Sequence, residues 1–348
     1  MQAPMNILVL KPGPLGGVLM TTPLLATIRA AYPDARIDFA VGERSRPGIA
    51  TNPDINEVIP LFEGADRSEA PAIQVAAAAF RLRWRRYDMA FCADDSPATR
   101  HVAYLAGIPR RFGLARGAAP GLTDAVRVAD DGHEVDRYLA LAEKAGLRRH
   151  LRRDLKYVPT QGSLERAIQL LKSRGFDALP FRVALCPGGG DAPGDTRDHR
   201  RWPAERYALL ANEMIERYGG GVVLLGEESE RELNFLVRND INHPVLDLTG
   251  RLELDGVGAV MQLCDAVIAN DTGSMHLAVA VGTPTVGIFG PTAARTAGPY
   301  GRRHRAVQSH VWCGPCAGIG GPMEGCGAAC IQRITVRDLV AVLESRPA

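Results

Sequence analysis

The chain has 348 residues, of which 46% are hydrophobic and 23% charged, and its formal net charge at pH 7 is +2. This composition indicates a globular chain long enough for two hydrophobic cores, and the small net charge argues against general nucleic-acid binding. No apolar run approaches the roughly 20 residues that span a bilayer, and the start, MQAPMNILVL, lacks the layout of a signal peptide. We therefore expect a cytoplasmic protein.

The first part of the chain alternates short apolar strand patterns with amphipathic helical patterns. Strands are predicted at 6–10, 37–41, 58–61, 89–93 and 110–113, and helices at 18–32, 70–86, 97–106 and 133–145. Such alternation predicts an α/β domain with a parallel, doubly wound sheet. The polar, irregular section that follows, 148–162, is typical of a linker.

The same alternation then starts again. Strands are predicted at 183–186, 222–225, 246–248, 266–269 and 285–289, and helices at 163–174, 204–218, 228–238, 256–263 and 274–281. The sequence therefore predicts two Rossmann-like domains, 1–162 and 163–334, which face each other across a cleft. A last helix at about 335–348 is expected to pack back on the first domain.

The most informative stretch is NDTGSMHLAVAVGTPTVGIFGPT, from Asn270 to Thr292. An apolar strand ends at Asn270, Asp271 or Thr272 is suited to cap the following helix, and Gly273 allows a tight turn. The unpaired N–H groups at such a helix start suit a phosphate or pyrophosphate at the carboxyl edge of the sheet. The alternative is an ordinary strand-to-helix turn with a good cap.

Several stretches together resemble the family of bacterial ADP-heptose:lipopolysaccharide heptosyltransferases. They are ILVLKPGPLGGVLMTTPLLATIRAAYPDARIDFAV at the start, PGG and RRWPAERY, LLGEESERE, the stretch that begins at Asn270, and the cysteine-rich tail before ITV. The resemblance implies a GT-B fold in which the first domain binds the acceptor and the second binds the nucleotide-diphosphate sugar. It also implies an inverting, metal-independent transfer of heptose from ADP-heptose, with no cofactor, to lipopolysaccharide core at the inner face of the cytoplasmic membrane.

The resemblance assigns donor binding to two segments of the second domain. At the first segment, the helix start at Asp271, Thr272 and Gly273 would hold the diphosphate, and Ser274 and His276 would add hydrogen-bond donors. The second segment is the loop 187–203. Its glycines either let the backbone approach a phosphate or make the loop flexible, and they are Gly188, Gly189 and Gly190.

Two further donor contacts follow from the resemblance. The family commonly has Lys-x-Trp-Pro where this chain has Arg200-Arg201-Trp202-Pro203, so Arg200 takes the place of a lysine that meets the diphosphate or the sugar. Glu228 resembles the glutamate that binds ribose, but a solvated helix start would also account for it.

The general base is where the chain departs from the family. The first loop of the family usually ends Leu-Gly-Asp with the aspartate as proposed base, but here the loop ends with Gly16 and Gly17. We assign Lys11, Gly16 and Gly17 to substrate binding. The candidates for the base are Asp94 and Asp95, which follow a strand; they could equally cap the helix that begins at Pro97.

This departure leaves three functions open. The first is heptosyl transfer to lipopolysaccharide core, an anionic glycolipid acceptor. The second is transfer of a heptose or related sugar to a protein or small-molecule hydroxyl, and the third is non-catalytic binding of a sugar nucleotide. Separately, arginines surround Trp84 at 81, 83, 85 and 86, and they form either a peripheral contact with anionic lipid headgroups or a solvated helix end.

Four cysteines crowd the tail with the spacing C-x2-C-x9-C-x3-C: Cys313, Cys316, Cys326 and Cys330. Two close pairs of this kind resemble tetrahedral zinc or iron sites, which would be structural here. Free thiols are the alternative. In a cytoplasmic protein, either is favoured over disulfides.

Overall fold

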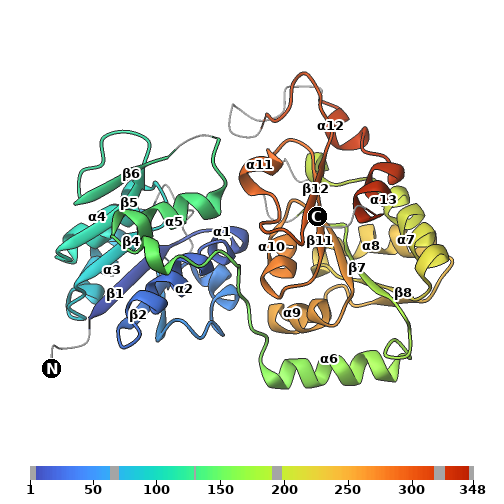
Figure 1. The fold of residues 1–348 in the computed structure, drawn as a ribbon, viewed down its shortest axis with the longest axis horizontal. Helices are drawn as coiled ribbons and strands as arrows, with labels where there is room; N and C mark the ends of the chain where they lie inside the picture. The colour runs from blue at the N-terminus through green and yellow to red at the C-terminus, as the bar shows by residue number, and fades with distance from the viewer. Residues whose placement is uncertain (1–4, 63–69, 129–130, 190–197, 317–325, 345–348) are drawn as a thin grey trace. The chain divides into compact units, whose positions relative to one another are not determined.

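The computed structural model describes residues 5–62, 70–128, 131–189, 198–316 and 326–344. The chain divides into two compact units, Met1–Tyr157 and Val158–Ala348 (Figure 1). Each unit is built on one six-stranded sheet. Within the described part of the chain, no helix combines the length and the apolarity that crossing a bilayer requires.

The sheet of the first unit is parallel and has the strand order β3-β2-β1-β4-β5-β6. Its strands are β1 (Asn6–Lys11), β2 (Arg36–Val41), β3 (Glu57–Pro60), β4 (Met89–Cys92), β5 (Arg110–Ala115) and β6 (Asp124–Arg127). The helices are α1 (Leu15–Leu19), α2 (Thr22–Ala31), α3 (Ala72–Arg83), α4 (Pro97–Leu105) and α5 (Glu134–Lys144), with 3-10 turns η1 (Glu43–Gly48) and η2 (Arg148–His150). The central strands are buried apolar runs because helices cover both faces of the sheet.

Two helices cover one face of this sheet together. α3 and α4 pack against each other and bury apolar side chains, among them Val75, Leu82 and Val102, against Leu8 and Leu10 of β1. The chain order places α2 on the opposite face, because right-handed crossovers leave and return on opposite sides of β1. There α2 packs with α5.

The sheet of the second unit is also parallel, and its order is β12-β11-β10-β7-β8-β9. Its strands are β7 (Arg182–Cys186), β8 (Gly221–Leu224), β9 (Val245–Asp247), β10 (Ala266–Asn270), β11 (Thr285–Phe289) and β12 (Arg305–Gln308). The helices are α6 (Gln161–Ser173), α7 (Ala204–Tyr218), α8 (Arg231–Asn239), α9 (Leu254–Gln262), α10 (Gly273–Ala280), α11 (Ala294–Ala297), α12 (Ala329–Gln332) and α13 (Val336–Glu344), with 3-10 turns η3 (Asp198–Arg200) and η4 (Glu228–Glu230).

The two sheets share one topology, which confirms the prediction of two doubly wound, Rossmann-like folds. In each, the first strand of the unit lies beside the fourth, so β1 pairs with β4 and β7 pairs with β10. The crossovers leave these two strands in opposite directions, and their carboxyl ends therefore open a crevice that open α/β sheets use for ligands. This topology directs attention to the residues just after β1, β4, β7 and β10.

Some predicted elements differ from those observed. α1 begins at Leu15, so Gly16 and Gly17 lie in its first turn rather than in a loop. The last helix, α13, packs on α7, and its Leu339 and Val340 join the core of the second unit. The expectation that this helix packs back on the first domain stays a prediction, while its apolar stripe belongs to the core of the second unit. A short amphipathic helix buries its apolar stripe against any matching surface, and the sequence does not reveal which surface that is.

Candidate active site

The carboxyl edge of the second sheet presents an open helix start. Thr272 is extended at φ −144°, and α10 begins at Gly273 without a side-chain cap. Among the residues that the structure describes, no protein acceptor receives the backbone N–H groups of Thr272, Gly273 and Ser274. Within the same part of the chain, the buried Thr272 Oγ1 also lacks a hydrogen-bond partner. These groups form a ready site for an anion.

A buried asparagine holds the surrounding loops in place. Asn270, the last residue of β10, is fully buried, and its Nδ2 donates to the carbonyl oxygens of Pro187 (2.7 Å) and Gly188 (3.0 Å). Its Oδ1 accepts from the backbone N of Trp202 (3.2 Å) and the hydroxyl of Tyr207 (3.0 Å). One side chain thus joins the ends of β7 and β10 and the Trp-Pro segment. No sequence pattern marks Asn270 as more than the end of a strand.

Arg200 lies beside the same helix start. Its Nη1 is 3.6 Å from Asp271 Oδ2 and 3.5 Å from the Asp271 carbonyl oxygen, distances that are long for hydrogen bonds. Trp202 anchors the segment, because its ring is fully buried and its Nε1 donates to the Ile334 carbonyl (2.9 Å). The structure therefore brings Arg200 and Asp271 together at the start of α10.

The predicted glycines and His276 also lie at this edge. Gly188 and Gly189 follow β7 after Pro187 and are buried, whereas Gly190 falls outside the described residues. His276, on α10, is only 4% exposed. A Cβ on Gly188 would lie 1.6 Å from Glu230 Oε1, so only glycine fits beside that carboxylate.

Glu230, rather than Glu228, lies beside Gly188. Its Oε2 accepts from the backbone N of Glu227 (2.9 Å) in a capping box that begins η4. Glu228 is exposed and pairs with Arg231, which lowers the pKa of the Glu228 carboxyl. The two carboxylates are two residues apart, and only the turn of η4 decides which one points toward Gly188.

The first unit places a buried carboxylate at the equivalent edge. Asp94 follows β4 and is 9% exposed; its carboxylate accepts from Thr99 Oγ1 (3.0 Å) and weakly from the Ser96 N–H (3.3 Å). Burial raises the pKa of Asp94 to about 6, and nearby Lys11 partly opposes that rise. Lys11 ends β1, which pairs with β4. The crevice at the carboxyl ends of these two strands therefore holds an acid and a cation together.

The neighbouring aspartate is in a different environment. Asp95 is exposed and its Oδ2 lies 2.9 Å from Arg116 Nε. Ser96, not either aspartate, is the residue that caps α4. Asp94 is therefore the better placed of the two candidates for a base that titrates near neutral pH.

The residue that replaces the family aspartate lies close to the same lysine. A Cβ on Gly17 would be 3.0 Å from Lys11 Cε and 3.5 Å from Lys11 Nζ. Lys11 Nζ also lies 4.9 Å from the ring centre of Tyr138. A carboxylate at position 17 would thus lie beside Lys11, as Asp94 does. Position 17 and Asp94 are therefore two places from which an acidic group can interact with the same lysine.

The cysteine-rich tail does not form a recognisable metal site. None of the four cysteines, Cys313, Cys316, Cys326 and Cys330, is in a disulfide. Burial raises the pKa of the Cys316 thiol, and the nearby thiols of Cys326 and Cys313 add to that rise. Nowhere in the described ranges, which include these four cysteines, are three His, Cys, Asp or Glu side chains placed to hold a metal ion. In the described chain these side chains do not adopt a metal-binding arrangement, and the zinc or iron stays a prediction.

Comparison with known proteins identifies the family. The model of glycosyltransferase family 9 (heptosyltransferase) matches residues 75–326, which is most of the chain. The chain belongs to this family. As a family 9 glycosyltransferase, it is 30% identical over 314 residues to lipopolysaccharide heptosyltransferase 2 of Escherichia coli K12, a match that covers 87% of this chain and 88% of that protein.

Solved structures agree with the fold of this family 9 enzyme. The E. coli ADP-heptose lps heptosyltransferase II has a TM-score of 0.74 and 26% identity, with 97% of both chains covered. E. coli heptosyltransferase WaaC with ADP has a TM-score of 0.71 and 22% identity, and the match covers 98% of this chain and 99% of that one. The GT-B prediction and the prediction of a heptosyltransferase-like enzyme are both confirmed.

Proposed function

We propose that the protein is an inverting, metal-independent heptosyltransferase that moves heptose from ADP-heptose to a hydroxyl of the lipopolysaccharide core. The observation that carries this proposal is the open start of α10, where the N–H groups of Thr272, Gly273 and Ser274 lack protein acceptors in the described chain. Support for the donor and the acceptor comes from the E. coli relatives, one named for ADP-heptose and another bound to ADP.

In this proposal the second unit binds the donor. The N–H groups at α10 receive the diphosphate, and Thr272 Oγ1, Ser274 and His276 add donors at the same edge. Arg200, near Asp271, supplies positive charge, and Gly188 and Gly189 admit the phosphates to the end of β7. Fixed dipoles and a guanidinium stabilise the charge that builds on departing ADP, so a metal ion is not needed for that role.

The first unit binds the acceptor and supplies the base. Asp94 takes the proton of the acceptor hydroxyl as its oxygen bonds to the anomeric carbon. On the opposite face, the bond from that carbon to the diphosphate breaks, and ADP leaves with the electron pair. One displacement inverts the anomeric centre. A carboxylate with a pKa of about 6 is suited to this work near neutral pH, and Lys11 helps to keep it ionised.

The acceptor is an anionic glycolipid at the inner face of the cytoplasmic membrane. Gly17, which replaces the aspartate usual in the family, favours one competing acceptor class, a protein or small-molecule hydroxyl. Assays with a panel of acceptors distinguish the glycolipid from the competing class.

The test measures ADP release from ADP-heptose with heptose-deficient lipopolysaccharide core, a peptide pool and small alcohols, each with and without EDTA. We expect turnover with the core acceptor alone, unchanged by EDTA, and an inverted anomeric centre by NMR. ADP-heptose binding without turnover on any acceptor would support a non-catalytic binder instead. Turnover that EDTA abolishes would disprove metal independence.

A further inference from the structure

Helix α3 has two apolar faces, although only one of them meets the core. Val75, Ala78 and Leu82 pack against the sheet. On the other side, Ile73 is 76% exposed, Phe80 64% and Trp84, which ends the helix, 71%. A surface helix normally turns polar residues outward, so this second apolar face calls for a partner.

The exposed residues form one continuous stripe. Positions 73, 76, 77, 80 and 84 follow the spacing i, i+3, i+4, i+7 and i+11, and the residues at 76 and 77 are exposed alanines. The Phe80 and Trp84 rings meet edge to face with centres 6.1 Å apart. Two exposed aromatic rings at one end of an alanine-rich helix are suited to the boundary between water and lipid.

The charge within this stretch of the chain has a single sign. From Ala70 to Tyr87 the chain carries four arginines and no acidic residue. Arg85 turns away, because both of its terminal nitrogens lie 2.6 Å from Glu57 oxygens. Arg81, Arg83 and Arg86 are exposed and have no acidic partner within the described segments. These three exposed guanidinium groups are suited to an anionic partner.

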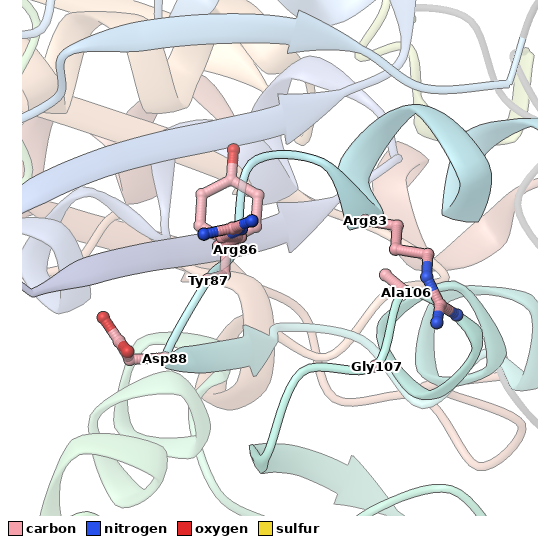
Figure 2. Close-up of a pocket in the computed structure, with 6 residues that line it drawn as sticks. All are labelled: Arg83, Arg86, Tyr87, Asp88, Ala106 and Gly107. Carbon is pink, nitrogen blue, oxygen red and sulfur yellow. The ribbon is translucent and has the colours of Figure 1, made fainter.

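A hollow of about 330 Å³ adjoins the end of the stripe (Figure 2). It is lined by Arg83, Arg86, Tyr87, Asp88, Ala106 and Gly107. Its acidic member is already engaged, because Asp88 Oδ2 accepts from the backbone N of Asn6 at 2.7 Å. Tyr87 is also held, since its hydroxyl donates to buried Asp38 at 2.7 Å. Arg83 and Arg86 therefore leave positive charge at the edge of this hollow.

We propose that the outward face of α3, comprising Ile73, Phe80, Arg81, Arg83, Trp84 and Arg86, docks on an anionic lipid bilayer. The aromatic rings enter the headgroup boundary, and the three arginines contact lipid phosphates. A second copy of the chain fits less well, because a two-fold interface would oppose arginines with arginines. This inference does not rest on the proposed transferase activity, because lipid binding is measured without turnover.

Vesicle binding by the full chain tests the proposal. We expect co-sedimentation with phosphatidylcholine mixed with phosphatidylglycerol, weakening as salt rises, and little with phosphatidylcholine alone. Each arginine near an anionic surface contributes about a fivefold gain in partitioning. The triple variant R81E/R83E/R86E should therefore bind at least about a hundredfold more weakly. Unchanged binding by this variant would overturn the proposal.

A matched pair of variants tests the apolar stripe. F80S/W84S should lose most vesicle binding, whereas F235S/L236S, which alters two side chains on α8 that are also more than half exposed, should not. Urea unfolding of all variants checks the fold of the first unit, which contains α3, because the proposal places ADP in the second unit. If both pairs lose binding equally, or if F80S/W84S instead dissolves a dimer, the α3 surface is not a lipid site.

Fluorescence reports directly on insertion. The chain has three tryptophans; Trp202 is fully buried and Trp312 is exposed. In a Trp312→Phe background, Trp84 emission should shift to the blue on vesicle addition and be quenched by lipids brominated in their acyl chains. An emission spectrum that stays fixed while the protein binds vesicles would contradict insertion at α3.

Discussion

Burial distinguishes two adjacent aspartates in the first unit. Asp94 and Asp95 are neighbours in the sequence. Asp94 lies near Lys11 in the crevice at the carboxyl ends of β1 and β4, whereas Asp95 pairs with Arg116 at the surface. Desolvation disfavours the charged form of Asp94 and raises its pKa to about 6, above the ordinary value of 3.8. The native carboxyl therefore keeps its proton to higher pH than the unfolded one.

This shift predicts how stability depends on pH. Because the folded pKa of Asp94 is raised, its contribution is most favourable below pH 4 and is lost as pH rises toward 6. In the ionised form, the buried carboxylate costs about 3 kcal/mol. The difference in unfolding free energy, wild type minus Asp94→Asn, should fall by about that amount between pH 4 and pH 7. Urea denaturation at both values measures it, and a pH-independent difference would contradict the raised pKa.

Gly17 offers a second residue-scale prediction. Asp94→Asn should lower kcat by about 10²-fold to 10⁴-fold if Asp94 is the base. Adding Gly17→Asp should restore part of the rate, because a carboxylate there would lie beside Lys11, whose flexible end can shift to make room. Gly17→Ala in the Asp94→Asn background is the control, and steady-state ADP release is the measurement. Equal rates for the two double variants would show that position 17 cannot supply a base.

At the scale of elements, one strand end organises the proposed donor site. Asn270 links the ends of β7 and β10 to the Trp202 segment through four hydrogen bonds, all of them buried. Regular strand and helix patterns bring these segments to the same edge. The buried amide then fixes their separation, so the N–H groups of α10 and the Arg200 guanidinium are positioned before a ligand arrives.

Removal of that amide should cost both stability and donor affinity. Asn270→Ala leaves several buried polar groups unpaired, and we expect the unfolding free energy to fall by about 3 kcal/mol. Asn212→Ala is the control, because Asn212 also bridges two backbone groups, Asp240 O and Asn242 N, but in an exposed position. It should cost less than about 1 kcal/mol. Denaturant unfolding and ADP titration of both variants test this, and similar losses would argue against the role of Asn270.

At the scale of the whole molecule, the chain repeats one topology in two units. Both sheets carry the order 3-2-1-4-5-6 when their strands are numbered within each unit. The crevice after the first and fourth strands holds Lys11 and Asp94 in one unit and Gly188 and Asp271 in the other. The same geometry thus presents the proposed base in the first unit and the proposed anion site in the second.

This division predicts where ADP protects the chain. Saturating ADP, at about 100 times its Kd, should stabilise the binding unit by about 2.7 kcal/mol. Hydrogen–deuterium exchange should slow in peptides that contain Gly188, Thr272 and Ser274, while peptides of the first unit that contain Asp94 stay unchanged. Protection confined to the first unit would reverse the proposed assignment of donor and acceptor.

Much of this fold was predictable from the sequence. Strands covered by helices on both faces are unbroken apolar runs, so β1, β4, β7 and β10 were evident, and the turn after each of them marked a candidate site. The motif after Asn270 and the Trp-Pro segment were visible for the same reason, because local backbone geometry requires particular residues. Edge strands β6 and β12, which bury few side chains, left no such pattern.

Other features were decided only by tertiary structure, because they depend on partners distant in the chain. Local sequence does not say whether Asp94 or Asp95 is buried, whether Glu230 or Glu228 reaches Gly188, or that α13 packs on α7. The exposure of Phe80 and Trp84 was also decided by tertiary structure. The sequence of an alanine-rich helix does not show which of its faces packs against the sheet. Sequence determines which elements form, and packing determines which of their side chains are free to act.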